Sequence, residues 1–257
     1  MWELSISVDT KNIDIAKFIY QTLKSQTAEF GGVVTCYEEF EKIFVLIACP
    51  LEEQERVSIV VKRCIIKSIC NFYKQNFLDE KLCLPLHENI SLTAFKKALL
   101  NFDRETDFYI ISKNIELDKN FYLDSFYNFK LKALRDKWEE LVCLANENCD
   151  YLVSNDAFYD LLKFLIDNLE VGQDEIDVFE DENGYSISAT DMQECECEKL
   201  TEEKLVSSLI DICPKRINFF CKNDDDTAVF LRKIFEERVN VCYNKTLENI
   251  DNFSLLK

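Results

Sequence analysis

The alternation of apolar and polar residues predicts a strand and then a helix at the start of the chain. Every second residue is apolar at Trp2, Leu4, Ile6 and Val8, which is the period of a half-buried strand. Asp9 and Thr10 offer caps for a helix over about residues 13–28. Residues 33–37 and 43–48 are β-branched runs around an acidic turn, so they predict a hairpin.

The period changes after Glu52, where one broad helical face is apolar. This face comprises Val57, Val61, Cys64, Ile65, Ile69 and Phe72, and basic residues fall elsewhere, at Arg56, Lys62, Arg63, Lys67 and Lys74. Such a helix could lie on an anionic membrane, but its apolar face also suits packing on the adjacent sheet, and we prefer this second interpretation. Residues 1–80 therefore form a predicted β-α-β-β-α domain.

The middle of the chain, residues 90–170, is predicted to be helical. Ser91 caps its first helix. Two apolar stripes then favour a pair of packed helices, one with Leu131, Leu134, Trp138, Leu141, Ala145 and Leu152, the other with Phe158, Leu161, Leu162, Leu165 and Leu169.

The C-terminal part, residues 172–257, is predicted to run β-β-α-β-α-β. Apolar alternation on both sides of Asn183-Gly184 predicts a hairpin, and Thr201 caps the next helix. A strand at residues 217–221, a helix to about Arg238 and a strand at residues 239–243 follow. The predicted fold class is α+β, with a β-containing unit at each end of a helical region.

Charge narrows the range of partners. The 257 residues carry a net charge of −18, and 20 Phe with 10 Tyr supply ample core, so the chain should fold and should repel nucleic acid. Between Glu170 and Glu203 stand 13 acids and one base, Lys199. This acidic region, residues 170–203, is either a solvated loop or a docking surface for a basic protein.

Cysteine content and hydropathy indicate the cellular compartment in which the protein is expected. Twelve cysteines without an apolar leader favour a reducing cytoplasm, where thiols fill cores as small apolar groups. We expect core positions for Cys36, Cys49, Cys64, Cys70, Cys143, Cys213 and Cys221. No apolar run approaches the ~20 residues that a transmembrane helix needs.

Few residues suggest chemistry. The single histidine, His87, is more simply a loop residue than a catalytic base, and Cys195 and Cys197 have a poor zinc spacing. Residues 224–226 are three aspartates that could hold a cation but stand where a helix needs caps. The four glycines form no phosphate-binding motif, so we expect no metal and no cofactor.

Lys215 and Arg216 are the best ligand-binding candidates. They directly follow a predicted helix end, where two cations could bind an anion. Bases at this place also satisfy terminal carbonyls and the helix dipole, so the structural interpretation stays open.

Two segments, residues 126–132 with Asn128-Phe129-Lys130 and residues 205–242 with Pro214, Lys215, Phe235 and Cys242, resemble the YtxC family of sporulation proteins of endospore-forming Firmicutes. In the first segment, Asn128-Phe129-Lys130 is similar to the family's Asn-Phe-Arg. The chain departs from the family where Lys245 stands near the place of a second terminal cysteine. The resemblance implies a cytosolic protein of a spore-forming bacterium and implies no reaction.

Two hypotheses follow. The first is a non-catalytic interaction or regulatory protein of sporulation, which uses the acidic region 170–203. The second is a small-ligand-binding protein or enzyme that uses carboxylates with Lys215 or Arg216 in a cleft between the terminal units.

Overall fold

The computed structural model describes residues 1–83, 90–147, 155–189, 199–221 and 226–243, and it confirms the α+β class. The chain divides into two compact units. Unit 1 contains Met1–Cys83 and Asp103–Asn148, and unit 2 contains Leu84–Phe102 and Cys149–Lys257. The predicted central helical region is therefore shared between the units.

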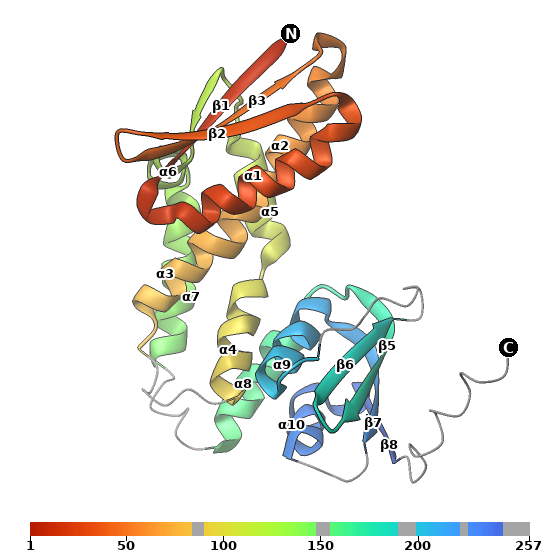
Figure 1. The fold of residues 1–257 in the computed structure, drawn as a ribbon. Coiled ribbons are helices and arrows are strands. Elements are labelled where there is room, and N and C mark those ends of the chain that lie inside the picture. The colour runs from red at the N-terminus through yellow and green to blue at the C-terminus, as the bar shows by residue number, and fades with distance from the viewer. Residues whose placement is uncertain (84–89, 148–154, 190–198, 222–225, 244–257) are drawn as a thin grey trace, which may run out of the picture. The chain divides into compact units, whose positions relative to one another are not determined.

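Unit 1 is built on a four-stranded sheet with the order β2-β3-β1-β4 (Figure 1). Its strands are β1 (Trp2–Asp9), β2 (Val33–Glu39), β3 (Lys42–Cys49) and β4 (Asn120–Tyr122), and β4 runs parallel to β1. The antiparallel register sets Leu4 opposite Ile47 and Ile6 opposite Val45. All four of these side chains are buried on the face that α1 (Ile13–Thr27) and α2 (Gln54–Ser68) cover.

The helix that begins as α2 changes register at a π-helical turn, η4 (Ile69–Tyr73), and continues as α3 (Lys74–Lys81). A π turn inserts one extra residue into the α-helical repeat, so every later side chain moves to a different face. Phe72 is therefore only half-buried, whereas Tyr73 and Lys74 are buried. The sequence interpretation, which set Lys74 off the buried face, was wrong for this reason.

The remaining helices of unit 1 pack against the α2–η4–α3 helix, against the sheet and against one another. They are α5 (Arg104–Asn114), the short α6 (Leu123–Ser125), a second π-helical turn η5 (Phe126–Lys130) and α7 (Lys132–Glu147). Trp138 of α7 is 1% exposed and belongs to the same apolar core as the sheet. Short 3₁₀ turns η1 (Thr10–Asn12), η2 (Ala28–Phe30) and η3 (Leu51–Glu53) connect the N-terminal elements.

Unit 2 contains a mixed sheet with the order β6-β5-β7-β8. The strands are β5 (Gln173–Asp181), β6 (Gly184–Ala189), β7 (Pro214–Cys221) and β8 (Val239–Tyr243); β5, β7 and β8 are parallel, and β5 and β6 form the predicted hairpin. The helices are α4 (Ile90–Asn101), α8 (Asn155–Asp167), α9 (Glu202–Ile212) and α10 (Asp226–Phe235), followed by η7 (Glu236–Arg238). Figure 1 shows α8, α9 and α10 on one side of this sheet.

The cysteine expectations hold in part. Cys49, Cys64, Cys70, Cys213 and Cys221 are buried, but Cys36 and Cys143 are exposed. Cys36 lies on β2, an edge strand that receives little cover, and Cys143 lies on the outer side of α7. Among the described residues no helix is long and apolar enough to cross a membrane.

Candidate functional site

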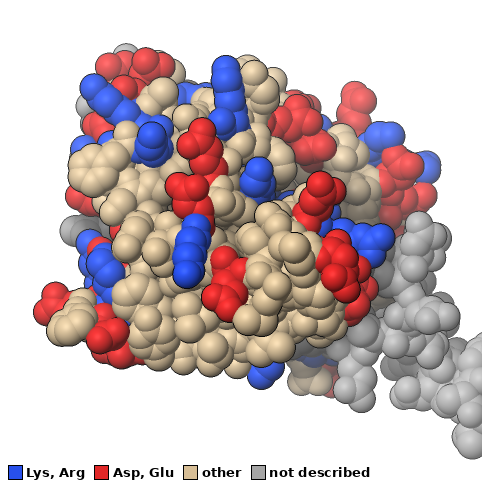
Figure 2. All heavy atoms as spheres, turned by 90° about the horizontal axis from the view of Figure 1, so that it is seen from above, with Lys and Arg blue, Asp and Glu red and all other residues tan. Residues whose placement is uncertain are grey.

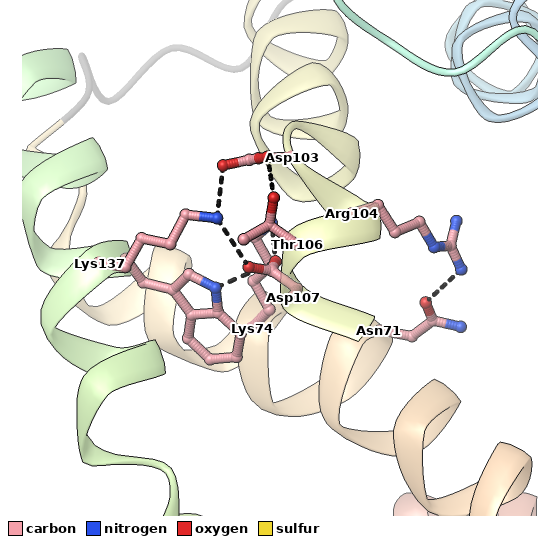
Figure 3. Close-up of polar contacts among 8 residues, drawn as sticks. Asn71, Lys74, Asp103, Arg104, Thr106, Asp107 and Lys137 are labelled. Atoms are coloured by element: carbon pink, nitrogen blue, oxygen red, sulfur yellow. Dashed lines mark hydrogen bonds and ion pairs between the residues drawn. The ribbon is translucent and has the colours of Figure 1, made fainter. Parts of the chain in front are cut away.

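A buried ion pair occupies the core of the helical part of unit 1 (Figure 3). Lys74 Nζ donates to Asp107 Oδ2 over 2.7 Å, and both side chains are 1% exposed. Trp138 Nε1 donates to the same carboxylate oxygen over 3.1 Å. Burial lowers the pKa of Lys74, and the nearby Asp107 carboxylate opposes that shift. The pair joins α3, α5 and α7 through one carboxylate.

A second lysine extends this cluster towards the surface. Lys137 Nζ lies 3.4 Å from Asp107 Oδ1 and also pairs closely with Asp103. Thr106 Oγ1 donates to Asp103 Oδ1 over 2.7 Å. Burial alone would raise the pKa of Asp103, but the hydrogen bonds from Lys137 and Thr106 outweigh it and hold that pKa below its usual value. The four charges alternate in sign, which lowers the cost of burying them.

Asp124 forms the second buried polar cluster of unit 1. Its carboxylate accepts hydrogen bonds of 2.7 Å each from the Asp9 backbone N–H, Asn12 Nδ2 and Tyr73 Oη. Burial, together with the Asp124 charge, raises the pKa of Tyr73 well above its usual range. Asp124 therefore ties the end of β1 to α6 and to the π turn η4. Both clusters hold helices and strands together; Lys74, Asp107 and Asp124 are buried, whereas Lys137 and Asp103 are partly exposed.

The open face of the sheet in unit 1 carries a groove of about 410 Å³. Val33, Leu46 and Ala48 give it an apolar floor, and polar or charged side chains line the rest, namely Glu3, Ser5, Thr35, Tyr37, Lys119 and Asn120. Seen from above in Figure 2, acidic and basic side chains are interspersed with other residues, and neither sign of charge dominates. The groove can take a small ligand that has both apolar and polar groups.

The two predicted cations of unit 2 are each paired with an acid on the neighbouring strand. Lys215 Nζ lies 2.6 Å from Asp174 Oδ1, and Arg216 donates to Glu175 Oε2 over 3.0 Å. The strand register explains the second pair, because Glu175 stands directly opposite Arg216 in the parallel ladder. Asn218 continues the row, with hydrogen bonds of 2.8 Å to Glu175 and to Asp177. Lys215 and Arg216 thus serve as counterions for the acids of β5.

Within the acidic region 170–203 the start of β6 lies beside the residues that precede α9; residues 190–198 fall outside the described chain. Backbone hydrogen bonds of 3.0 and 2.8 Å join Tyr185 at the start of β6 to Leu200, and Lys199 pairs with Asp181. This bridge brings the first turn of α9 next to the β5–β6 turn. Four exposed acids gather there, namely Asp181, Glu182, Glu202 and Glu203.

The residues that carry the family resemblance are spread over both units. Asn128, Phe129 and Lys130 form the π turn η5, where Phe129 is 81% exposed and the Asn128 carbonyl accepts from Arg135 over 2.6 Å. In unit 2 Pro214 begins β7, Phe235 is buried, and Cys242 accepts a long contact of 3.7 Å from Asn240. Five of the residues considered for catalysis, metal binding or capping lie outside the described chain: His87, Cys195, Cys197, Asp224 and Asp225.

A family model described as the YtxC-like family matches residues 88–240, which is more than half of the chain. The chain belongs to the YtxC-like family. This confirms the resemblance noted for residues 126–132 and 205–242. Membership of the YtxC-like family implies a sporulation-associated protein. No curated protein and no solved structure matches the chain.

Sequence reasoning missed both buried carboxylates. Asp107 lies in a segment whose apolar pattern is weak, and Asp124 lies in a short aromatic segment without a clear period, so nothing marked them as interior. The only usable clue was the aromatic content around them, since Trp138 and Tyr73 each need a polar partner when buried.

Proposed function

We propose that this YtxC-like protein acts in sporulation by binding a basic protein partner, as a non-catalytic interaction or regulatory protein. The docking surface would be the acidic end of unit 2, formed by the β5–β6 turn and the first turn of α9. The observation that carries the proposal is the Tyr185–Leu200 bridge, which joins the β5–β6 turn to the start of α9, where exposed carboxylates stand on both segments. A cluster of like charges on a folded surface steers association with an oppositely charged partner.

The ion pairs of the sheet support this choice of surface. On β5, Asp174 and Glu175 already have basic partners on β7, which reduces the negative field at that end. Glu202 and Glu203 lie in the first turn of α9, where the helix dipole favours negative charge. At the acidic end Lys199 pairs with Asp181, and the exposed Glu202 and Glu203 add negative charge beside this pair.

The test is quantitative affinity purification from sporulating cells. The variant E182Q/E202Q/E203Q removes three exposed charges from the acidic end, and E38Q/E39Q/E41Q removes three exposed charges from the β2–β3 turn of unit 1. We expect a basic protein to co-purify with the natural chain and with the second variant, and to be lost from the first. Equal recovery with both variants would contradict the proposed surface.

The groove of unit 1 favours a second candidate, a small-ligand-binding protein. Glu3 and Lys119 provide opposite charges beside an apolar floor, so an amphipathic ligand with a charged group would fit. A thermal-shift panel of metabolites tests this candidate, because a ligand that binds the native state raises the melting temperature. A rise that the substitution L46E abolishes would support the groove, and a panel without any shift would count against it.

A further inference from the structure

The end of α3 is held against α7 by three polar contacts within unit 1. Lys81 Nζ lies 3.3 Å from the Glu139 carboxylate. Asn146 Nδ2 donates to the Lys81 carbonyl over 3.0 Å, and Asn146 Oδ1 accepts from the Cys83 backbone N–H over 2.9 Å. The segment from Lys81 to Cys83 therefore runs along one strip of α7.

Cys143 lies beside this strip. It is four residues after Glu139 and three before Asn146, and these spacings put the three side chains on one face of a helix. Helical side chains lean towards the N-terminus, so the Asn146 amide covers the turn that begins near Cys143. The Cys83 backbone, bound to that amide, is thus brought to the level of Cys143.

Both thiols are free and exposed. Cys83 lies two residues after Lys81, the last residue of α3, and its backbone N–H donates to Asn146 instead of to the helix. Its backbone can therefore adjust to the Cα separation of about 4.4–6.8 Å that a disulfide needs.

We propose that Cys83 and Cys143 are a redox modification site, at which a reversible disulfide links the end of α3 to α7. The oxidant is a low-molecular-weight disulfide such as oxidised glutathione. One thiolate attacks it and forms a mixed disulfide with release of one thiol. The second thiolate then displaces the other thiol, so the pair loses two protons and two electrons and the oxidant is reduced to two thiols.

The position of the pair gives the bond a structural consequence. The chain leaves unit 1 after Cys83 and again after Asn148. A Cys83–Cys143 bond would hold these two exits together, whereas the reduced protein holds them through Asn146. Disulfides in reducing compartments are mostly transient and redox-sensing, which fits a bond between exposed cysteines. This inference is independent of the proposed partner.

The experiment uses the full chain, reduced, then incubated with oxidised glutathione at pH 8 and digested without reduction. We expect a peptide that links Cys83 to Cys143, and a loss of two free thiols from the twelve of the chain. The C83S and C143S variants should lack that linked peptide. The control C36S, which removes another exposed cysteine, should keep it.

Two further results test the proposed Cys83–Cys143 disulfide. N146A should form the bond more slowly, because Cys83 loses the contact that holds it near α7. The inference is overturned if Cys83 and Cys143 are both recovered as alkylated thiols or glutathione adducts. A bond from Cys83 to Cys149 in place of Cys143 would overturn it too.

Discussion

Lys74 and Asp107 face each other across 2.7 Å in the interior of unit 1, with 1% of each side chain exposed. A buried ion pair stabilises a fold little by its net charge attraction, because both ions lose their water. The pair instead makes the packing of the helices specific. The Asp107 carboxylate accepts hydrogen bonds from Lys74 and Trp138 together, so it fixes how α3, α5 and α7 meet.

Removing one partner of this pair should therefore be costly. We expect K74M to lower the free energy of unfolding by about 3–5 kcal/mol, because Asp107 is left as an uncompensated buried charge. The double variant K74M/D107L should cost less than K74M alone. Both tryptophans belong to unit 1, so their fluorescence in urea reports its unfolding.

The control is K67M, which changes an exposed lysine of α2 and should stay within about 0.5 kcal/mol of the natural chain. A K74M protein as stable as K67M would show that the Lys74–Asp107 ion pair does not hold α3, α5 and α7 together.

The register shift at η4 also shows what the sequence could and could not predict. The strands, the two hairpins and the long helices follow from apolar periodicity and caps such as Thr201, whose side chain accepts from the Lys204 N–H. The π turn at residues 69–73 leaves no mark in that periodicity, so the burial of Lys74 could not be foreseen. The three-residue strand β4 was missed because it is too short to show alternation.

The surface ion pairs between β5 and β7 could not be predicted from the sequence, for a different reason. Lys215 and Arg216 were recognised as cations, but their partners Asp174 and Glu175 depend on the register of two parallel strands some forty residues apart. Local sequence does not encode such a register, which is set by packing of the whole sheet.

Asp124 should be as important to unit 1 as the ion pair. D124N keeps the shape of the side chain but gives an amide group in place of one acceptor oxygen, so at least one of the donors from Asp9, Asn12 and Tyr73 is left unpaired. We expect a loss of about 1–3 kcal/mol in the free energy of unfolding. Urea titration followed by tryptophan fluorescence measures it, with the exposed Asp136→Asn as the matched control.

Asp103 should contribute to the acid sensitivity of unit 1. Its pKa is lowered in the folded protein, so its contribution to stability is complete above the ordinary value of 3.8 and is lost as the pH falls through the lower native pKa. D103N should therefore be less stable than the natural chain at pH 7, and the difference should shrink below about pH 4. A stability difference between D103N and the natural chain that stays constant from pH 7 to pH 3 would contradict a role of Asp103 in acid sensitivity.

Exposed cysteines should react with an alkylating agent faster than buried cysteines. Burial raises the pKa of Cys64 to about 12 and that of Cys70 to about 11, so both thiolates are scarce at pH 8. Iodoacetamide should modify the exposed Cys36, Cys83 and Cys143 in the native protein, and should reach Cys64 and Cys70 only after unfolding. Peptide mass spectrometry of timed samples reads the order, and early modification of Cys64 would contradict the buried assignment.

Binding of a basic partner at the acidic end of unit 2 is tested most directly by site-specific photo-cross-linking in sporulating cells. A photoreactive residue at Asn183, in the β5–β6 turn, is compared with one at Phe40, which is exposed in the β2–β3 turn. We predict a discrete adduct with one basic protein from position 183 and not from position 40. No adduct from position 183, or the same adducts from both positions, would contradict the claim.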